Sequence, residues 1–325
     1  MAKRKHITTV LAILLTIYTP SCVLIGSAEG AENSINRPSL LEQVKHAILF
    51  LGHINDKGEP EFRATGFLIR VASHVYLVTA KHVVVDRESG KKLDEKMHAF
   101  FNSQTGTLSH KPLANITKLG FNWVFHENPA VDIALLPFLI VSEDNLKNIQ
   151  LITVQEDGWL DFQELQELED VFFISYQPEV QINGGMITSV VRRGMVSLKK
   201  EDKSFYIDGA AFPGNSGSPV FLKPSINRSG SGFVGSGESS KPFIGLIGEY
   251  IPYRDIAVSQ QTKRPRVVFE ENTGLSRVWS TDLLRDVLTS KAFIDQQKRL
   301  EELRKKAIEA QRDPEAGQIV TPNAQ

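Results

Sequence analysis

The chain has 325 residues, which allows one large or two ordinary domains with a sizeable hydrophobic core. Its 37 basic and 38 acidic side chains give a formal net charge of −1, so the charge balance indicates no nucleic-acid partner. Hydrophobic residues make up 41% and charged residues 23%, which excludes a disordered chain and a membrane protein with several spans. A single cysteine, Cys22, excludes a disulfide framework.

The first 28 residues have the pattern of an export signal. Three basic residues at positions 3–5 precede an apolar run over residues 7–18, and Gly26-Ser27-Ala28 offers small residues for cleavage. We therefore expect an exported protein, periplasmic or secreted, with no stable membrane insertion after cleavage. Two alternatives stay open, namely an uncleaved membrane anchor over residues 7–28 and a lipoprotein modified at Cys22.

From about Val44 the sequence is a series of short segments rich in Val, Ile, Phe and Tyr, separated by turn-forming residues. No crossover helices alternate with them, so the pattern favours antiparallel barrels or sandwiches over a parallel α/β sheet. The expected strands are residues 47–51, 65–71, 75–79, 97–101, 133–138, 171–176, 188–198, 205–208, 218–222, 243–253 and 267–271.

Other segments depart from this strand pattern. Residues 225–240 are rich in Gly and Ser and predict a flexible surface loop, because no Gly-Lys-Ser/Thr follows to make a phosphate-binding loop. Residues 281–289 and 293–311 predict helices. The second has a short apolar stripe, which favours packing on the domain; oligomerisation through this helix is possible but nothing supports it. The expected organisation is a signal peptide, a linker, a main domain, a C-terminal helix and a disordered tail, over residues 1–28, 29–43, 44–290, 291–312 and 313–325.

Three short segments carry residue types suited to nucleophilic catalysis. An apolar strand ends at His82, Asp132 precedes another strand, and Ser216 lies in a turn between two glycines. A serine hydroxyl needs an adjacent base, imidazole is a suitable one, and a carboxylate can fix the imidazole tautomer. The N–H groups of Gly214 and Ser216 can converge on a developing oxyanion. Taken alone, each segment also fits a surface histidine, a helix cap or a tight turn.

The strings TAKH at His82, VDIALLPF around Asp132 and GNSGSPVF around Ser216 resemble the three motifs of trypsin-like, chymotrypsin-fold serine peptidases, in the same order. The similarity is closest to cysteine-free bacterial members and covers roughly residues 44–289. It implies an all-β fold of two antiparallel six-stranded β-barrels, with the active site in the cleft between them and C-terminal helices after them. It also implies a secreted serine endopeptidase that acts on protein or peptide substrates through an acyl-enzyme, with no cofactor and no metal.

Two departures from the family pattern lead to further expectations. Asn215 stands where digestive members have an aspartate, so we expect hydrogen bonds of its amide to order the turn, in place of a newly cut N-terminal amine. The resemblance implies that the position six before Ser216, Ala210, lies at the base of the primary specificity pocket, and that the strand of residues 245–249, with Gly248, supplies its wall. Ala210 predicts a preference for apolar or small residues over Lys and Arg, unless Glu249 reaches the pocket.

Other classes of protein fit less well. An α/β-hydrolase esterase needs Gly-x-Ser-x-Gly and the opposite order of the three residues. A metallohydrolase is disfavoured because the eight histidines include no HExxH motif or other close ligand pair. The remaining alternative is a non-catalytic secreted binding module that retains the peptidase fold.

Overall fold

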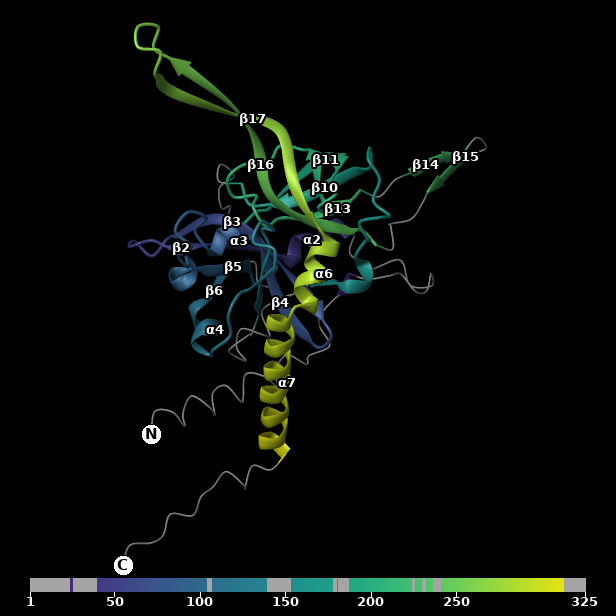
Figure 1. Cartoon of the computed structure of the whole chain (residues 1–325). Coiled ribbons are helices and arrows are strands. Elements are labelled where there is room, and N and C mark those ends of the chain that lie inside the picture. Colours follow the sequence, from purple (N-terminus) through teal and green to yellow (C-terminus); the bar gives the residue numbers. More distant parts are fainter. Residues whose placement is uncertain are drawn as a thin grey trace, which may run out of the picture.

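Two β structures, one from each half of the chain, form the body of the protein, and helices follow at its C-terminal end (Figure 1). This arrangement confirms the expected all-β fold with C-terminal helices. The computed structural model describes residues 24–25, 40–103, 107–138, 153–177, 180, 187–223, 226–229, 232–235 and 241–312.

The first half forms a nine-stranded sheet in which seven strands follow the order β6-β5-β2-β3-β4-β8-β7. Strands along this path pair antiparallel, whereas the short strand β9 pairs in parallel with β1 and β3. The pairs among the described residues leave β6 and β7 at the two ends of the path, so they do not form the closed ring of six that the resemblance implies. The strands are β1 Leu24–Ile25, β2 Ile48–Ile54, β3 Pro60–Val71, β4 His74–Thr79, β5 His98–Asn102, β6 Leu108–Pro112, β7 Val124–Phe125, β8 Ala134–Pro137 and β9 Thr153–Gln155.

The second half closes into a six-stranded barrel in the order β10-β11-β12-β17-β16-β13, as expected. Alternate residues of its strands point inward, and a buried apolar cluster that includes Phe173, Phe205 and Ile247 fills the interior. Its strands are β10 Asp170–Ser175, β11 Val190–Lys199, β12 Ser204–Asp208, β13 Pro219–Leu222, β16 Phe243–Val258 and β17 Pro265–Ser280.

Strands β16 and β17 are much longer than expected, with 16 residues each. Their distal parts leave the barrel as a two-stranded hairpin, which extends away from the body of the protein (Figure 1). We call residues 253–271 the arm. Residues 274–278 lie inside β17, so the expected short strand at 267–271 is one part of a continuous strand that runs to the helix.

The two longest described helices lie at the C-terminal end, and shorter ones lie between the strands of the first half. The short ones are α2 Leu40–Ala47, η2 Asp94–Lys96, α3 Lys81–Val84, α4 Ala114–Lys118 and η3 Glu156–Gly158, and the last two are α6 Thr281–Thr289 and α7 Lys291–Arg312. Helix α7 packs back onto the first half, because the ring of Phe293 lies 4.9 Å from that of Tyr76 and Arg304 donates a hydrogen bond to Ser73. This confirms the expected packing of the last helix on the domain. No helix among the described residues is long and apolar enough to cross a bilayer.

Two parts of the expected organisation need comment. The Gly/Ser-rich segment 225–240 contains a small hairpin of β14 Ile226–Ser229 and β15 Gly232–Gly235, where the sequence predicted only a loop. Of the predicted signal peptide, the structure describes only the two residues of β1. The predicted tail 313–325 lies outside the described residues.

Candidate active site

The topology of the first sheet brings His82 and Asp132 together. His82 lies on α3, directly after β4, and Asp132 lies two residues before β8. Strands β4 and β8 are antiparallel neighbours with Thr79 opposite Ala134, so the end of one strand and the start of the other meet at the same edge. Ser216 comes from the second half, in the turn before β13.

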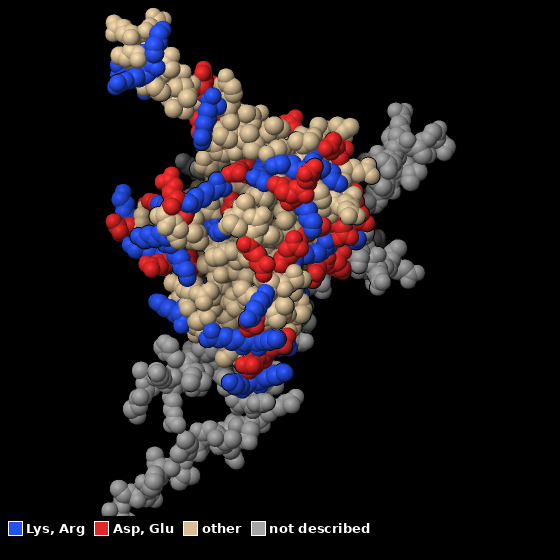
Figure 2. Space-filling model, in the orientation of Figure 1, with Lys and Arg blue, Asp and Glu red and all other residues tan. Residues whose placement is uncertain are grey.

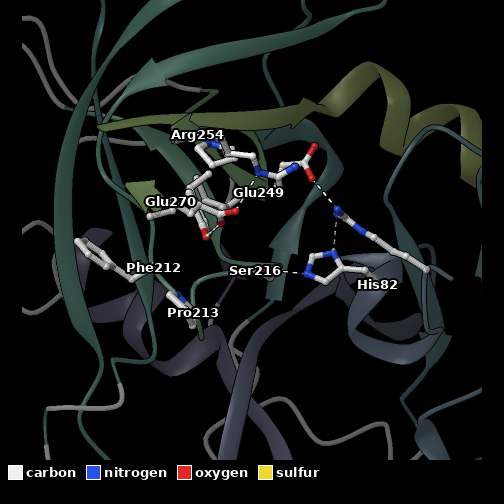
Figure 3. Close-up of a pocket in the computed structure, with 12 residues that line it drawn as sticks. His82, Phe212, Pro213, Ser216, Glu249, Arg254 and Glu270 are labelled. Carbon is white, nitrogen blue, oxygen red and sulfur yellow. Dashed lines mark hydrogen bonds and ion pairs between the residues drawn. The ribbon is translucent and has the colours of Figure 1, made fainter. Parts of the chain in front are cut away.

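The three side chains form a continuous chain of hydrogen bonds across the two halves, and Figure 3 shows its Ser216–His82 part. Nδ1 of His82 lies 2.6 Å from Oδ2 of Asp132, and Nε2 of His82 lies 2.9 Å from Oγ of Ser216. The backbone N–H of His82 donates to Oδ1 of Asp132 at 2.8 Å, so both carboxylate oxygens hold the same residue. Because an ionised carboxylate only accepts, Nδ1 carries the proton and Nε2 can accept from the serine hydroxyl.

Asp132 is buried, with 9% of its surface exposed. Burial raises the pKa of its carboxyl, but the hydrogen bonds and charge of His82, with the charge of Arg87, outweigh burial and hold this pKa below its ordinary value. The carboxylate therefore stays ionised beside the imidazole. Nη2 of Arg87 donates to Oδ2 of Asp132 at 2.9 Å, the same oxygen that receives Nδ1 of His82.

A four-residue turn precedes the serine. The backbone N–H of Asn215 donates to the carbonyl of Phe212 at 2.9 Å, with Pro213 second in the turn and Gly214 third. Gly214 has φ of +98°, and a proline followed by a glycine with positive φ is typical of a type II turn. The side chain of Asn215 accepts from the N–H of Phe212 at 2.9 Å and donates to the carbonyl of Tyr176 at 2.6 Å. These bonds confirm the expectation that the Asn215 amide orders the turn through backbone contacts.

Thr65, on β3 of the first sheet, fixes this turn through hydrogen bonds. Its hydroxyl donates to the carbonyl of Gly214 at 2.8 Å and accepts from the N–H of Tyr176 at 3.0 Å. Its backbone N–H donates to the carbonyl of Ser216 at 3.0 Å. Gly217 passes so close to Thr65 that a Cβ at this glycine would lie 2.2 Å from the Thr65 carbonyl oxygen, which explains why a residue without a side chain follows the serine.

The two expected oxyanion donors lie on this turn. Among the described residues, neither the N–H of Gly214 nor that of Ser216 donates to a protein acceptor. Backbone N–H groups that remain available beside a nucleophile can stabilise a negative charge on a substrate oxygen. The turn can therefore supply the two donors that acyl-transfer chemistry needs.

The model of the "Trypsin-like peptidase domain" family matches residues 64–224. These residues belong to the trypsin-like peptidase family. The matched segment begins in β3 and ends after β13, so it contains His82, Asp132 and Ser216. Among solved structures, the serine endoprotease from Yersinia pestis is similar, with 16% identity over 80% of this chain and 69% of that chain and a TM-score of 0.42. A comparison with curated proteins finds no match.

A cavity of about 300 Å³ opens beside Ser216 in the trypsin-like domain. Neither Ala210 nor Gly248 lines it, although both were expected at the primary pocket. A Cβ at Gly248 would lie 2.4 Å from Nε1 of Trp279, so this glycine packs against the tryptophan, while its neighbours Ile247 and Glu249 line the cavity. The lining residues are His82, Arg87, Ala211, Phe212, Pro213, Ser216, Ile247, Glu249, Tyr250, Pro252, Arg254 and Glu270.

The charged residues of this cavity are paired with one another. Nη1 of Arg87 donates to Oε2 of Glu249 at 2.6 Å, and Nε of Arg254 donates to Oε2 of Glu270 at 2.9 Å. Tyr250 also donates to Glu270, at 2.6 Å. Of these residues, the sequence analysis pointed only to Glu249, because it lies on the strand expected to form the pocket wall.

Proposed function

We propose that this protein is an exported serine endopeptidase that hydrolyses peptide bonds through an acyl-enzyme. The proposal rests on one observation above all, the hydrogen-bonded chain from Ser216 through His82 to Asp132. The family of residues 64–224 supports the same activity, because that family consists of peptidase domains. Protein or peptide chains are therefore the proposed substrates.

The proposed reaction uses these groups in two steps. Oγ of Ser216 attacks the scissile carbonyl carbon while Nε2 of His82 takes the hydroxyl proton, and Asp132 stabilises the resulting imidazolium. The carbonyl oxygen becomes an oxyanion that receives the N–H groups of Gly214 and Ser216. His82 then returns the proton to the leaving amine, and the acyl group stays on Oγ. In the second step His82 activates a water molecule, which attacks the ester, and the proton returns to Ser216.

The proposed substrate residue in the cavity is uncharged. Ala211, Phe212, Pro213 and Ile247 contribute apolar surface, and the Glu249 and Glu270 carboxylates are already paired with arginines. A substrate cation would lose hydration and would have to displace an arginine from one of these carboxylates, whereas an apolar side chain has neither cost. Glu249 lines the cavity, which was the exception to the argument from Ala210, so the proposed preference for apolar or small residues over Lys and Arg rests on the pairing of its carboxylate with Arg87 and not on Ala210.

Export is the proposed location, either periplasmic or secreted. It rests on the basic, apolar and small-residue segments of residues 1–28, which have the order of a cleavable signal. Mass spectrometry of the N-terminus after expression with export would locate the cleavage after Ala28, and an intact N-terminus would favour an anchored protein.

A covalent label tests the proposal against the alternative of a non-catalytic binding module. We expect a fluorophosphonate to modify Ser216 in the purified mature protein, and Ser216→Ala to abolish labelling and lower kcat for peptides by a factor on the order of 10⁶. Near-wild-type turnover by Ser216→Ala, or absence of labelling in a folded wild-type protein, would overturn the assignment. Ser218→Ala is the matched control, because this neighbouring serine is fully buried in the same turn.

A further inference from the structure

The arm, residues 253–271, has almost no contact with the rest of the protein. Every residue of the arm except Ser259 is exposed. Within the described residues, each arm strand pairs only with the other, so the ribbon has two open edges. A two-stranded ribbon with no layer packed on it is marginally stable in water.

Large apolar side chains occupy both faces of this ribbon. Ile256 lies opposite Val268 on one face, and Phe269 lies opposite Asp255 on the other. Six large apolar residues of the arm are each about half exposed, and they are Tyr253, Ile256, Val258, Val267, Val268 and Phe269. Large exposed apolar residues clustered on one element often mark an interaction site, and a long open edge with apolar side chains tends to associate.

The charges of the arm are separated along its length. The tip carries three basic residues, Lys263, Arg264 and Arg266, and no acidic one. The base carries the acidic residues Asp255, Glu270 and Glu271, of which Glu270 is paired with Arg254. Figure 2 shows basic side chains gathered at the far end of the arm, with acidic ones closer to the body. The apolar segment lies between these two charged ends.

We propose that the arm binds the arm of a second copy of this chain, with the two arms antiparallel about a two-fold axis. This arrangement places the basic tip of each arm against the acidic base of the other and buries the apolar segments on each other. The register of the hairpin fits, because the midpoint between acidic base and basic tip falls at the apolar pairs Ile256–Val268 and Ala257–Val267. A two-fold axis there superimposes the same apolar surface on both copies, as an isologous interface requires.

The opposite alignment is disfavoured by the same charges. Two parallel arms would bring the three basic residues at the tip of each copy together and leave the acidic bases side by side. Like charges that face one another destabilise an interface, and this repulsion selects the antiparallel pairing. A dimer of this kind also adjoins the cleft, since Tyr250, Pro252, Arg254 and Glu270 at the arm base line the cavity beside Ser216.

The test measures molar mass in solution, by sedimentation velocity and light scattering of the mature chain carrying Ser216→Ala. This background prevents self-digestion, and the test does not depend on the proposed activity. We expect a dimer that weakens as salt is raised. Lys263→Glu/Arg264→Glu/Arg266→Glu should raise the dimer dissociation constant at least tenfold, and so should Asp255→Lys/Glu271→Lys. An equimolar mixture of these two variants should dimerise again, because the reversed charges then match.

Two controls separate the proposal from general effects of charge. Lys45→Glu/Lys57→Glu/Lys118→Glu changes the net charge equally at exposed sites outside the arm and should leave the dimer intact. Phe269→Ser keeps all charges and should also weaken the dimer, and circular dichroism checks that each variant is folded. A monomeric wild-type chain at 100 µM, a dimer that survives tip reversal, or a mixture that stays monomeric would each overturn the proposal.

Discussion

The side chains of Arg87 and Glu249 meet across the cleft, with Nη1 of the arginine 2.6 Å from Oε2 of the glutamate. Arg87 belongs to the first half and Glu249 to β16 of the second. Cavities of about 300 and 370 Å³ are both lined by these two residues and His82, so the ion pair lies between them along the cleft. A peptide that occupies both cavities has to displace or pass over this pair.

Loss of the glutamate charge should help neutral substrates to bind. In Glu249→Gln the attraction across the cleft is gone, while Arg87 keeps its bond to Asp132. The two side chains are 53% and 35% exposed, and pairs of this kind contribute about 0.2–1 kcal/mol. We therefore expect KM for neutral peptides to fall about 1.5- to 5-fold with kcat nearly unchanged. Steady-state kinetics measures this, with Glu201→Gln as an exposed control; an unchanged KM would contradict it.

Loss of the arginine should change selectivity. Arg87→Gln leaves the Glu249 carboxylate in the cavity without its cation, so a Lys or Arg of the substrate can take that place. We expect the ratio of kcat/KM for basic over neutral peptides to rise about 2- to 5-fold, from the same range of pair energies. A peptide library measures the ratio. Arg87→Lys, which keeps the charge, should stay close to the wild type, and an unaltered ratio in Arg87→Gln would refute the idea.

The hydroxyl of Thr65 should matter for both stability and rate. Thr65→Val leaves the Gly214 carbonyl and the Tyr176 N–H without this buried partner, at a cost of about 1–3 kcal/mol for each unsatisfied group. Because these bonds fix the position of the turn that precedes Ser216, we also expect kcat to fall by a factor on the order of 10². Denaturant unfolding and single-turnover kinetics measure the two effects. Thr65→Ser should restore most of both, and a Val variant with normal kcat would show that the turn holds itself.

The depressed pKa of Asp132 predicts how its contribution to stability depends on pH. A carboxyl whose folded-state pKa lies below its unfolded value stabilises the protein above that unfolded value, near 4, and this stabilisation is lost as pH falls. The advantage of the wild type over Asp132→Asn in free energy of unfolding should therefore shrink as pH falls from about 6 to about 3. The same variant should lose on the order of 10⁴ in kcat. A stability difference that is constant with pH would show that the carboxylate has no net favourable contact.

Activity should not require a free N-terminus. Both polar atoms of the Asn215 amide already bond to backbone of Phe212 and Tyr176, so an N-terminal ammonium has no acidic partner at this turn. We expect a short tag placed before Glu29 to leave kcat/KM within twofold of that of the mature chain. The measurement compares tagged protein before and after removal of the tag. Protein that gains activity only on removal of the tag would contradict this account.

The three motif residues could be predicted because each lies in a short local string whose residue types suit one chemistry. Arg87 and Thr65 could not, because their contacts with Glu249 and Gly214 span 162 and 149 positions of the chain. No local sequence pattern predicts these two contacts, because they depend on how the two halves of the protein pack together. That Ala210 and Gly248 do not line the cavity could not be predicted, for a related reason. Counting along the sequence does not tell which residues of β16 line the cavity and which pack against Trp279.

Strand positions were predictable where a strand is buried on both faces and its sequence is a nearly continuous apolar run, as for β4 and β10. The arm was predicted only in part, at residues 267–271, and its first strand, residues 254–258, was missed. Neither face of the arm is buried, so that strand lacks the alternation of apolar and polar residues that marks a half-buried strand. Strand β6 was also missed, and no residue within it is buried. The sequence thus predicts strands that are buried in a core, and it predicts poorly strands that are exposed.

The packing of α7 has a consequence for how the protein is made. Synthesis runs from the N-terminus, so the first sheet leaves the ribosome long before the last helix, whose Arg304 contacts Ser73 across 231 positions. Until Phe293 has been synthesised, the ring of Tyr76 lacks the aromatic ring that packs against it in the folded protein. A chain that stops short of residue 291 therefore exposes apolar surface on the half that carries His82 and Asp132.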